Sequence, residues 1–72
     1  MKENEMEFII FCIENIAMAM GKEGQEVYRL LTYKKNIVKD YILSNYEILH
    51  TQSKEYIIED IIKYMIECGV LE

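Results

Sequence analysis

Apolar residues recur every three or four positions along almost the whole chain, a spacing that places them on one face of an α-helix. The clearest series comprises Met6, Ile9, Ile13, Ile16 and Met20. Gly21 follows this series directly, and a glycine in left-handed conformation commonly ends a helix. The pattern therefore predicts a first helix over residues 4–20.

This first predicted helix is apolar on more than one face. The members of a second apolar stripe are Phe8, Phe11, Cys12 and Ala19. Only a narrow polar face around Glu3, Glu7 and Glu14 remains. Such a helix either lies at the centre of its own domain or buries its outer stripe against another chain. The sequence leaves both alternatives open, and the second favours an interaction with a partner.

Three further helices and one short helical turn follow from the same spacing and from capping residues. The predicted ranges are 25–34, 37–44 and 53–68, with the turn near 46–50. We expect Gly24 to cap the second helix, Asn36 the third and Ser53 the last. The Ile-rich segments favour strands by propensity alone, but none alternates apolar and polar residues for long. We therefore expect an all-α fold, a small compact bundle of about four helices, as a single domain over residues 1–72.

Composition and charge narrow the class of protein. The chain has 72 residues, of which 51% are hydrophobic and 29% charged, so one small core is expected and disorder is not. The formal net charge of −5 repels nucleic-acid phosphates more than it attracts them. The longest apolar run, from Phe8 to Ile13, is far shorter than the roughly 20 residues that span a bilayer. We expect no membrane contact.

Cys12 and Cys68 are the two cysteines of the chain. Neither lies in a CxxC or a Cys/His cluster, and no signal-peptide pattern precedes the first predicted helix. We therefore expect reduced thiols and a cytoplasmic protein. A disulfide that joins the two terminal helices remains an open alternative, because sequence does not exclude proximity.

His50 is the only histidine and the first candidate for acid–base chemistry. A general base needs an orienting carboxylate and a nucleophile, whereas its neighbours Thr51 and Ser53 supply hydroxyls in no recognised motif. His50 and the nearby carboxylates and cysteines do not have the spacing of metal ligands. Gly21 and Gly24 do not form a phosphate-binding loop. We expect no enzyme, no metal and no cofactor, and a His50 that anchors a turn through the backbone.

The six tyrosines either close the rim of a small core or line a partner interface, and both interpretations stay open.

One basic patch comprises Arg29, Lys34, Lys35 and Lys39. It suggests a small nucleic-acid-binding regulator as an alternative function. The acidic remainder of the chain and the apolar positions of the third helix, such as Ile37 and Tyr41, disfavour DNA recognition.

Two runs of residues resemble a family of short bacterial proteins classed as a domain of unknown function. They are Tyr46-Glu47-Ile48-Leu49-His50-Thr51-Gln52 and Tyr56-Ile57-Ile58-Glu59-Asp60-Ile61. The resemblance covers most of the chain and includes the opening helix with Phe8 and Phe11. It implies a small partner of a neighbouring gene product, because members are often encoded beside an uncharacterised protein that resembles ADP-ribosyltransferases.

We therefore predict a non-enzymatic protein–protein interaction module that binds a protein partner or a second copy, with an antitoxin-like or regulatory role implied by the resemblance. The predicted partner-binding residues are Phe8, Phe11, Tyr46, His50, Thr51, Tyr56 and Asp60. A structural interpretation stands beside this one. In it, Thr51 or Ser53 caps the last helix, and Asp60 ties the first turns of that helix to the preceding loop.

Overall fold

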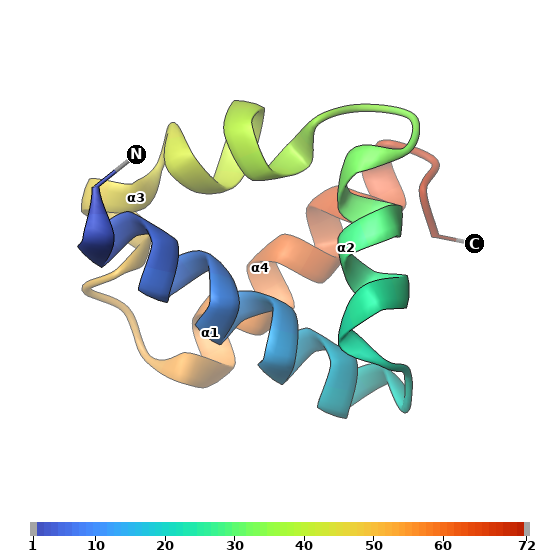
Figure 1. Cartoon of the computed structure of the whole chain (residues 1–72), viewed down its shortest axis with the longest axis horizontal. Helices are drawn as coiled ribbons and strands as arrows, with labels where there is room; N and C mark the ends of the chain where they lie inside the picture. Colours follow the sequence, from blue (N-terminus) through green and yellow to red (C-terminus); the bar gives the residue numbers. More distant parts are fainter. Residues whose placement is uncertain (1, 72) are drawn as a thin grey trace.

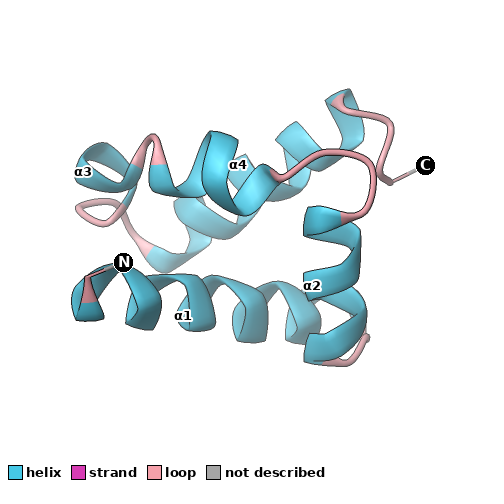
Figure 2. Cartoon of the chain, turned by 45° about the horizontal axis from the view of Figure 1, so that its top comes forward, coloured by secondary structure: helices cyan, strands magenta, loops and turns pink. Residues whose placement is uncertain are grey.

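The computed structural model describes residues 2–71, which form helices and connecting turns without a strand (Figure 2). The helices are α1 (Glu3–Met20), α2 (Gly24–Thr32), η1 (Val38–Leu43), α3 (Tyr46–Leu49) and α4 (Lys54–Glu67). The segment η1 is a short helix of the wide π type. The predicted all-α bundle of about four helices with a short helical turn is confirmed.

The long helix α1 organises the arrangement (Figure 1). It packs against α2, η1 and α4, while α3 continues from η1. In Figure 1, α2 (green) crosses one end of α1 (blue), η1 lies above, and α4 (orange) passes behind. Three elements thus share the inner side of α1.

Capping residues set most of the helix ends, as the sequence predicts. Gly21 follows α1 with a left-handed φ of 65°, which a residue with a Cβ rarely adopts. The Oδ1 atom of Asn36 accepts a hydrogen bond of 3.1 Å from the backbone N–H of Lys39. Ser53 Oγ accepts one of 3.2 Å from the backbone N–H of Tyr56. The predicted cap at Ser53 is confirmed, whereas the N-cap of η1 is Ile37, one residue after the predicted Asn36.

The second helix departs from its prediction at both ends. Gly24 is its first residue and Glu23 its N-cap, whose backbone N–H donates to Oε1 of Glu26 over 3.2 Å. The helix ends at Thr32 instead of residue 34. Beyond this end, the side chains of Lys34 and Lys35 contact Gly69 and Tyr64 across the bundle, and local helical spacing does not predict these contacts.

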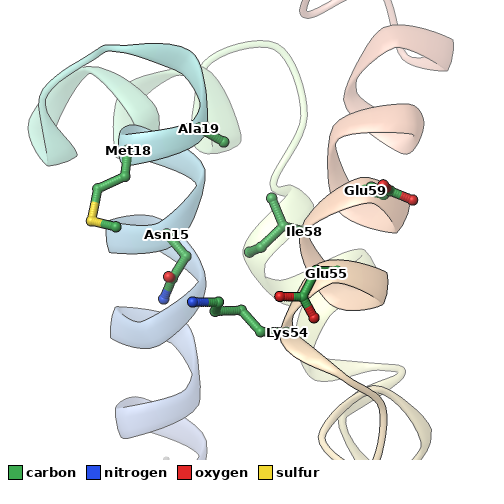
Figure 3. A pocket seen from close by; sticks show the side chains of 7 residues that line it. All are labelled: Asn15, Met18, Ala19, Lys54, Glu55, Ile58 and Glu59. Carbon is green, nitrogen blue, oxygen red and sulfur yellow. The ribbon is translucent and has the colours of Figure 1, made fainter.

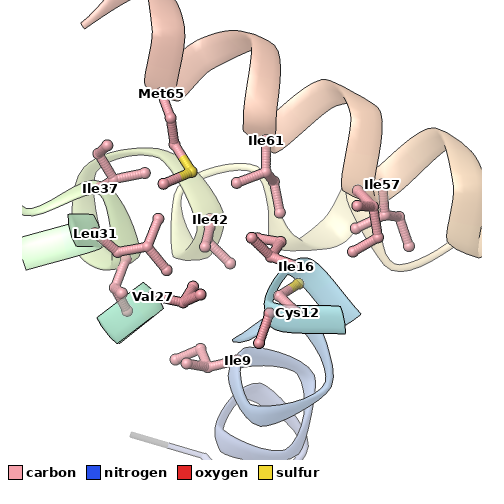
Figure 4. Close-up of a cluster of buried hydrophobic side chains, with 13 residues drawn as sticks. Ile9, Cys12, Ile16, Val27, Leu31, Ile37, Ile42, Ile57, Ile61 and Met65 are labelled. Carbon is pink, nitrogen blue, oxygen red and sulfur yellow. The ribbon is translucent and has the colours of Figure 1, made fainter. Parts of the chain in front are cut away.

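The core is apolar, with no buried polar or charged residue among the described residues. Its fully buried side chains come from α1, α2, η1 and α4 and from the residue before η1 (Figure 4), and the largest are Ile16, Leu31, Ile37, Ile42, Ile61, Met65, Val27 and Cys12. No buried side-chain nitrogen or oxygen within residues 2–71 lacks a hydrogen-bond partner. Burial of apolar area is therefore the main stabilising contribution.

The second stripe of α1 faces largely inward. Cys12 is completely buried, and Phe8 and Phe11 are half-buried against the core. Of the two alternatives, α1 thus lies mostly at the centre of its own domain. It is not fully enclosed, however, because Met6 and Met18 are 51% and 75% exposed.

Candidate functional site

A shallow groove lies between the C-terminal half of α1 and the N-terminal half of α4. We call it the α1–α4 groove, and its lining residues are Asn15, Met18, Ala19, Lys54, Glu55, Ile58 and Glu59. Its volume is about 400 Å³, which lies in the range of ligand pockets. In Figure 3, Ile58 and Lys54 point from α4 towards α1, and Asn15 points back towards Lys54.

Helical spacing places four residues on one side of α1, and two of them line the groove. Phe8, Phe11, Asn15 and Met18 follow one another at steps of three, four and three residues, so they share one side of the helix, and Asn15 and Met18 reach the groove. The Asn15 side chain donates to the carbonyl oxygen of Phe11 over 2.8 Å, which satisfies an amide on an otherwise apolar side. Met18 is the most exposed member of this series.

Four of the predicted partner-binding residues form an aromatic cluster at the other end of α1. The rings of Phe8 and Phe11 lie 6.2 Å apart, and Phe8 meets Tyr46 of α3 edge-on at 5.3 Å. Tyr46 in turn stacks on His50 at 4.5 Å. These contacts fix α3 on the first turns of α1, because edge-on and offset aromatic pairs are the favourable arrangements.

His50 and Thr51 close the end of α3. The Nδ1–H group of His50 donates to the carbonyl oxygen of Tyr46 over 2.7 Å, since a carbonyl can only accept. The hydroxyl of Thr51 donates to the carbonyl oxygen of Ile48 over 2.7 Å. The prediction that His50 anchors a turn through the backbone is confirmed. The cap of α4 is Ser53 and not Thr51.

The remaining two predicted residues, Tyr56 and Asp60, lie on α4, and Asp60 belongs to a second cluster with Tyr41 and Tyr64. Asp60 accepts a hydrogen bond of 2.6 Å from the hydroxyl of Tyr41 on η1. The Tyr41 ring stacks on Tyr64 at 3.9 Å. The expectation that Asp60 ties α4 to the preceding loop is therefore wrong, because its partner is on η1. Burial first, and then the hydrogen bond to Asp60, raise the pKa of Tyr41 above its ordinary value.

The basic patch is divided by the fold. Lys34 Nζ donates to the carbonyl oxygen of Gly69 over 3.1 Å, and Lys35 Nζ donates to the hydroxyl of Tyr64 over 3.3 Å. Arg29 and Lys39 are exposed and lie on different helices. Two of the four cations thus stabilise the carbonyl end of α4, where positive charge is favourable.

Both cysteines are free thiols, so the disulfide alternative does not hold. Burial raises the pKa of Cys12 to about 12, whereas Cys68 is partly exposed and its Sγ lies 3.9 Å from Lys35 Nζ.

Among the described residues, no three His, Cys, Asp or Glu side chains come together in a way that could hold a metal ion. Within residues 2–71, no helix combines the length and hydrophobicity that crossing a membrane requires.

The groove at Met18 was not among the sequence predictions. Its signal was the spacing of Met18 seven residues after Phe11 and ten after Phe8, which extends the second stripe along α1. Ile58 and Glu59 give no such signal, because their proximity to α1 depends on the packing of distant segments.

A model of the family described as "Protein of unknown function (DUF3791)" matches residues 7–67. The match therefore includes α2, η1, α3, α4 and all but the first turn of α1. No curated protein and no solved structure matches the chain.

Proposed function

The chain belongs to the DUF3791 family of proteins of unknown function, and from its surface we propose that it is a non-enzymatic protein–protein interaction module. One observation carries the proposal: Met18, at the α1–α4 groove, is 75% exposed although the same helix buries Cys12 and Ile16 completely. Exposed apolar side chains gathered at a groove are typical of protein interaction sites.

The contacts of His50 support a non-enzymatic role. Its ring stacks on Tyr46, and its Nδ1–H group is bound to the backbone of the same residue. A general base is instead oriented by a carboxylate or a similar group and directed at a nucleophile. The aromatic cluster of Phe8, Tyr46 and His50 then serves to hold α3 in place, and its exposed edge at His50 extends the surface for a partner.

We further propose a cytoplasmic protein whose partner is the product of a neighbouring gene, with an antitoxin-like or regulatory effect on it. The free thiols at Cys12 and Cys68 support the compartment, because disulfides are rare in the cytosol. The partner follows from the family resemblance of the sequence. Binding of a second copy is the other form that this interaction can take.

The alternative function is a nucleic-acid-binding regulator that uses Arg29, Lys34, Lys35 and Lys39. Lys34 and Lys35 are already engaged by Gly69 and Tyr64, and the net charge is −5. Both facts weigh against phosphate binding, whose affinity depends on the number of free cations.

The test places a photo-crosslinking benzoylphenylalanine at position 18 in the full chain. A matched variant carries it at Lys39, which is exposed on η1. We expect one cross-linked partner from position 18 in cells that also express the neighbouring gene, none from position 39, and a complex of the two purified proteins by light scattering. The proposal fails if position 18 gives no product beyond the control and the chain stays monomeric without a complex. Salt-dependent binding to duplex DNA would replace it with the alternative function.

A further inference from the structure

We infer that the α1–α4 groove binds an amphipathic helix of the partner, with its apolar face in the groove and Lys or Arg side chains along its edges. This inference rests on the proposed function, because it names the kind of partner that the same surface takes. Helices commonly bind to other proteins in this way, through apolar anchors in a groove between two helices.

The floor of the groove suits apolar anchors of varying shape. Met18 and Ala19 line it from α1 and Ile58 from α4. Methionine is flexible and polarizable, so it adapts to different side chains of a ligand. Ile58 points across the groove towards α1 (Figure 3), and the polar side chains of Asn15 and Lys54 lie together at one end of this apolar floor.

The edges of the groove are acidic. Glu55 and Glu59 line it from α4 and outweigh Lys54. Glu14, four residues before Met18, is exposed on the neighbouring side of α1. These carboxylates lie on a chain of net charge −5, so the field at the groove attracts cations. Complementary charge at an interface selects the partner and speeds association.

The same charges disfavour the other occupants. A second copy would bring its own net charge of −5 to an acidic edge, and like charges opposed at an interface are unfavourable. Two of its lysines, Lys34 and Lys35, are held by Gly69 and Tyr64 and would have to leave these contacts. Phosphate groups of nucleic acid are repelled for the same reason.

Two synthetic peptides of about 14 residues, roughly four helical turns, test the inference. Both carry leucine on one face, and the other face is lysine in the first and glutamate in the second. The isotope-labelled full chain is titrated with each, and its amide spectrum is followed. We expect the Leu/Lys peptide to shift the signals of Met18, Ala19 and Ile58 saturably, and the Leu/Glu peptide to bind at least about tenfold more weakly. The affinity for the Leu/Lys peptide should also fall as salt is added.

Charge reversal in the groove is the second arm. The variant Glu55→Lys with Glu59→Lys should lose about tenfold in affinity for the Leu/Lys peptide and gain affinity for the Leu/Glu peptide. The matched control, Glu47→Lys with Glu67→Lys, changes the net charge equally outside the residues that line the groove. It should leave the preference for the Leu/Lys peptide unchanged. Melting curves verify that all variants are folded.

Three results would overturn the inference. They are equal binding of both peptides, shifts that map away from the groove, and shifts of the groove signals that change with concentration of the chain alone, which would assign the groove to a second copy. The proposed function survives any of these as long as position 18 still cross-links to a partner. It fails separately, when neither a cross-link nor a complex forms.

Discussion

Replacement of Tyr41 with phenylalanine removes one hydroxyl from the junction of η1 and α4. That hydroxyl donates to Oδ2 of Asp60 over 2.6 Å. The Tyr41 ring stacks on Tyr64 at 3.9 Å, and phenylalanine retains this contact. The difference between wild type and Tyr41→Phe therefore measures the hydrogen bond with little change in packing.

The size of the effect follows from the charge and exposure of the pair. A hydrogen bond to a charged group contributes about 1.5–3 kcal/mol. Tyr41 and Asp60 are both only half-buried, so water replaces part of the lost bond at the carboxylate. We expect the free energy of unfolding to fall by about 1–2 kcal/mol. For a chain of this length the total is about 4–11 kcal/mol, so the loss is readily measurable.

Alkaline pH gives the same bond a second signature. Burial and Asp60 raise the pKa of Tyr41 above its ordinary value of 10.0, so the folded chain holds this proton more tightly than the unfolded chain does. The stabilising contribution is therefore complete below the unfolded pKa and is lost as the pH rises above it. The difference between wild type and Tyr41→Phe should shrink above about pH 10, by less than about 1.4 kcal/mol per pH unit, because solvent screens a partly exposed group.

Urea unfolding followed by circular dichroism gives both values, near neutral pH and at several pH values above about pH 9. The control is Tyr33→Phe, since the Tyr33 side chain is 77% exposed and its substitution should change the free energy of unfolding by less than about 0.5 kcal/mol. The reasoning is refuted if the two variants are equally stable. It is also refuted if the difference between wild type and Tyr41→Phe stays constant through about pH 11.

Three further predictions address the core, the thiols and a cap. Ile61→Val should lower the free energy of unfolding by about 0.5–1.5 kcal/mol, because Ile61 is fully buried. Ile66→Val on the same helix, at a residue 49% exposed, should change it by less than about 0.5 kcal/mol in urea titrations. A thiol reagent should modify Cys68 in the native chain and Cys12 only on unfolding, since Cys12 is buried with a raised pKa; equal labelling rates by mass spectrometry would contradict this. Ser53→Ala should cost about 1 kcal/mol through loss of the α4 cap, Ser53→Gly only a few tenths, and equal melting temperatures would show that the cap contributes nothing.

Local physics accounts for what the sequence predicted well. The ends of α1 and α4 follow from Gly21 and Ser53, whose conformations and side chains act within a few residues of the chain. Asn36 likewise predicts the start of the third helical segment to within one residue. The wide π form of η1 and the early end of α2 have no such local cause. Around them the contacts are with distant residues, such as the hydrogen bond between Tyr41 and Asp60, which lie 19 residues apart, and the period of apolar residues does not reveal such contacts.

The candidate site was only partly predictable for the same reason. The aromatic residues Phe8, Tyr46 and His50 do come together, as the shared apolar character of α1 and α3 allowed. Asp60 faces a different partner from the expected one. The α1–α4 groove needs the angle between two helices, which the apolar period of each helix alone does not determine.

The burial pattern separates the residues that stabilise this chain from those available to a partner. On α4, Ile57, Ile61 and Met65 are buried in the core, whereas Glu55 and Glu59 line the groove and are exposed. Because exposed side chains contribute little to the free energy of unfolding, changes at Glu55 and Glu59 should alter binding while the fold persists, whereas Ile58 belongs both to the groove and to the buried core. Loss of the hydrogen bond between Tyr41 and Asp60 should instead lower the free energy of unfolding and leave binding at the groove unchanged, since this bond joins η1 to α4 outside the groove. A small helical chain can thus keep an apolar groove open to a partner, as its own core is complete without it.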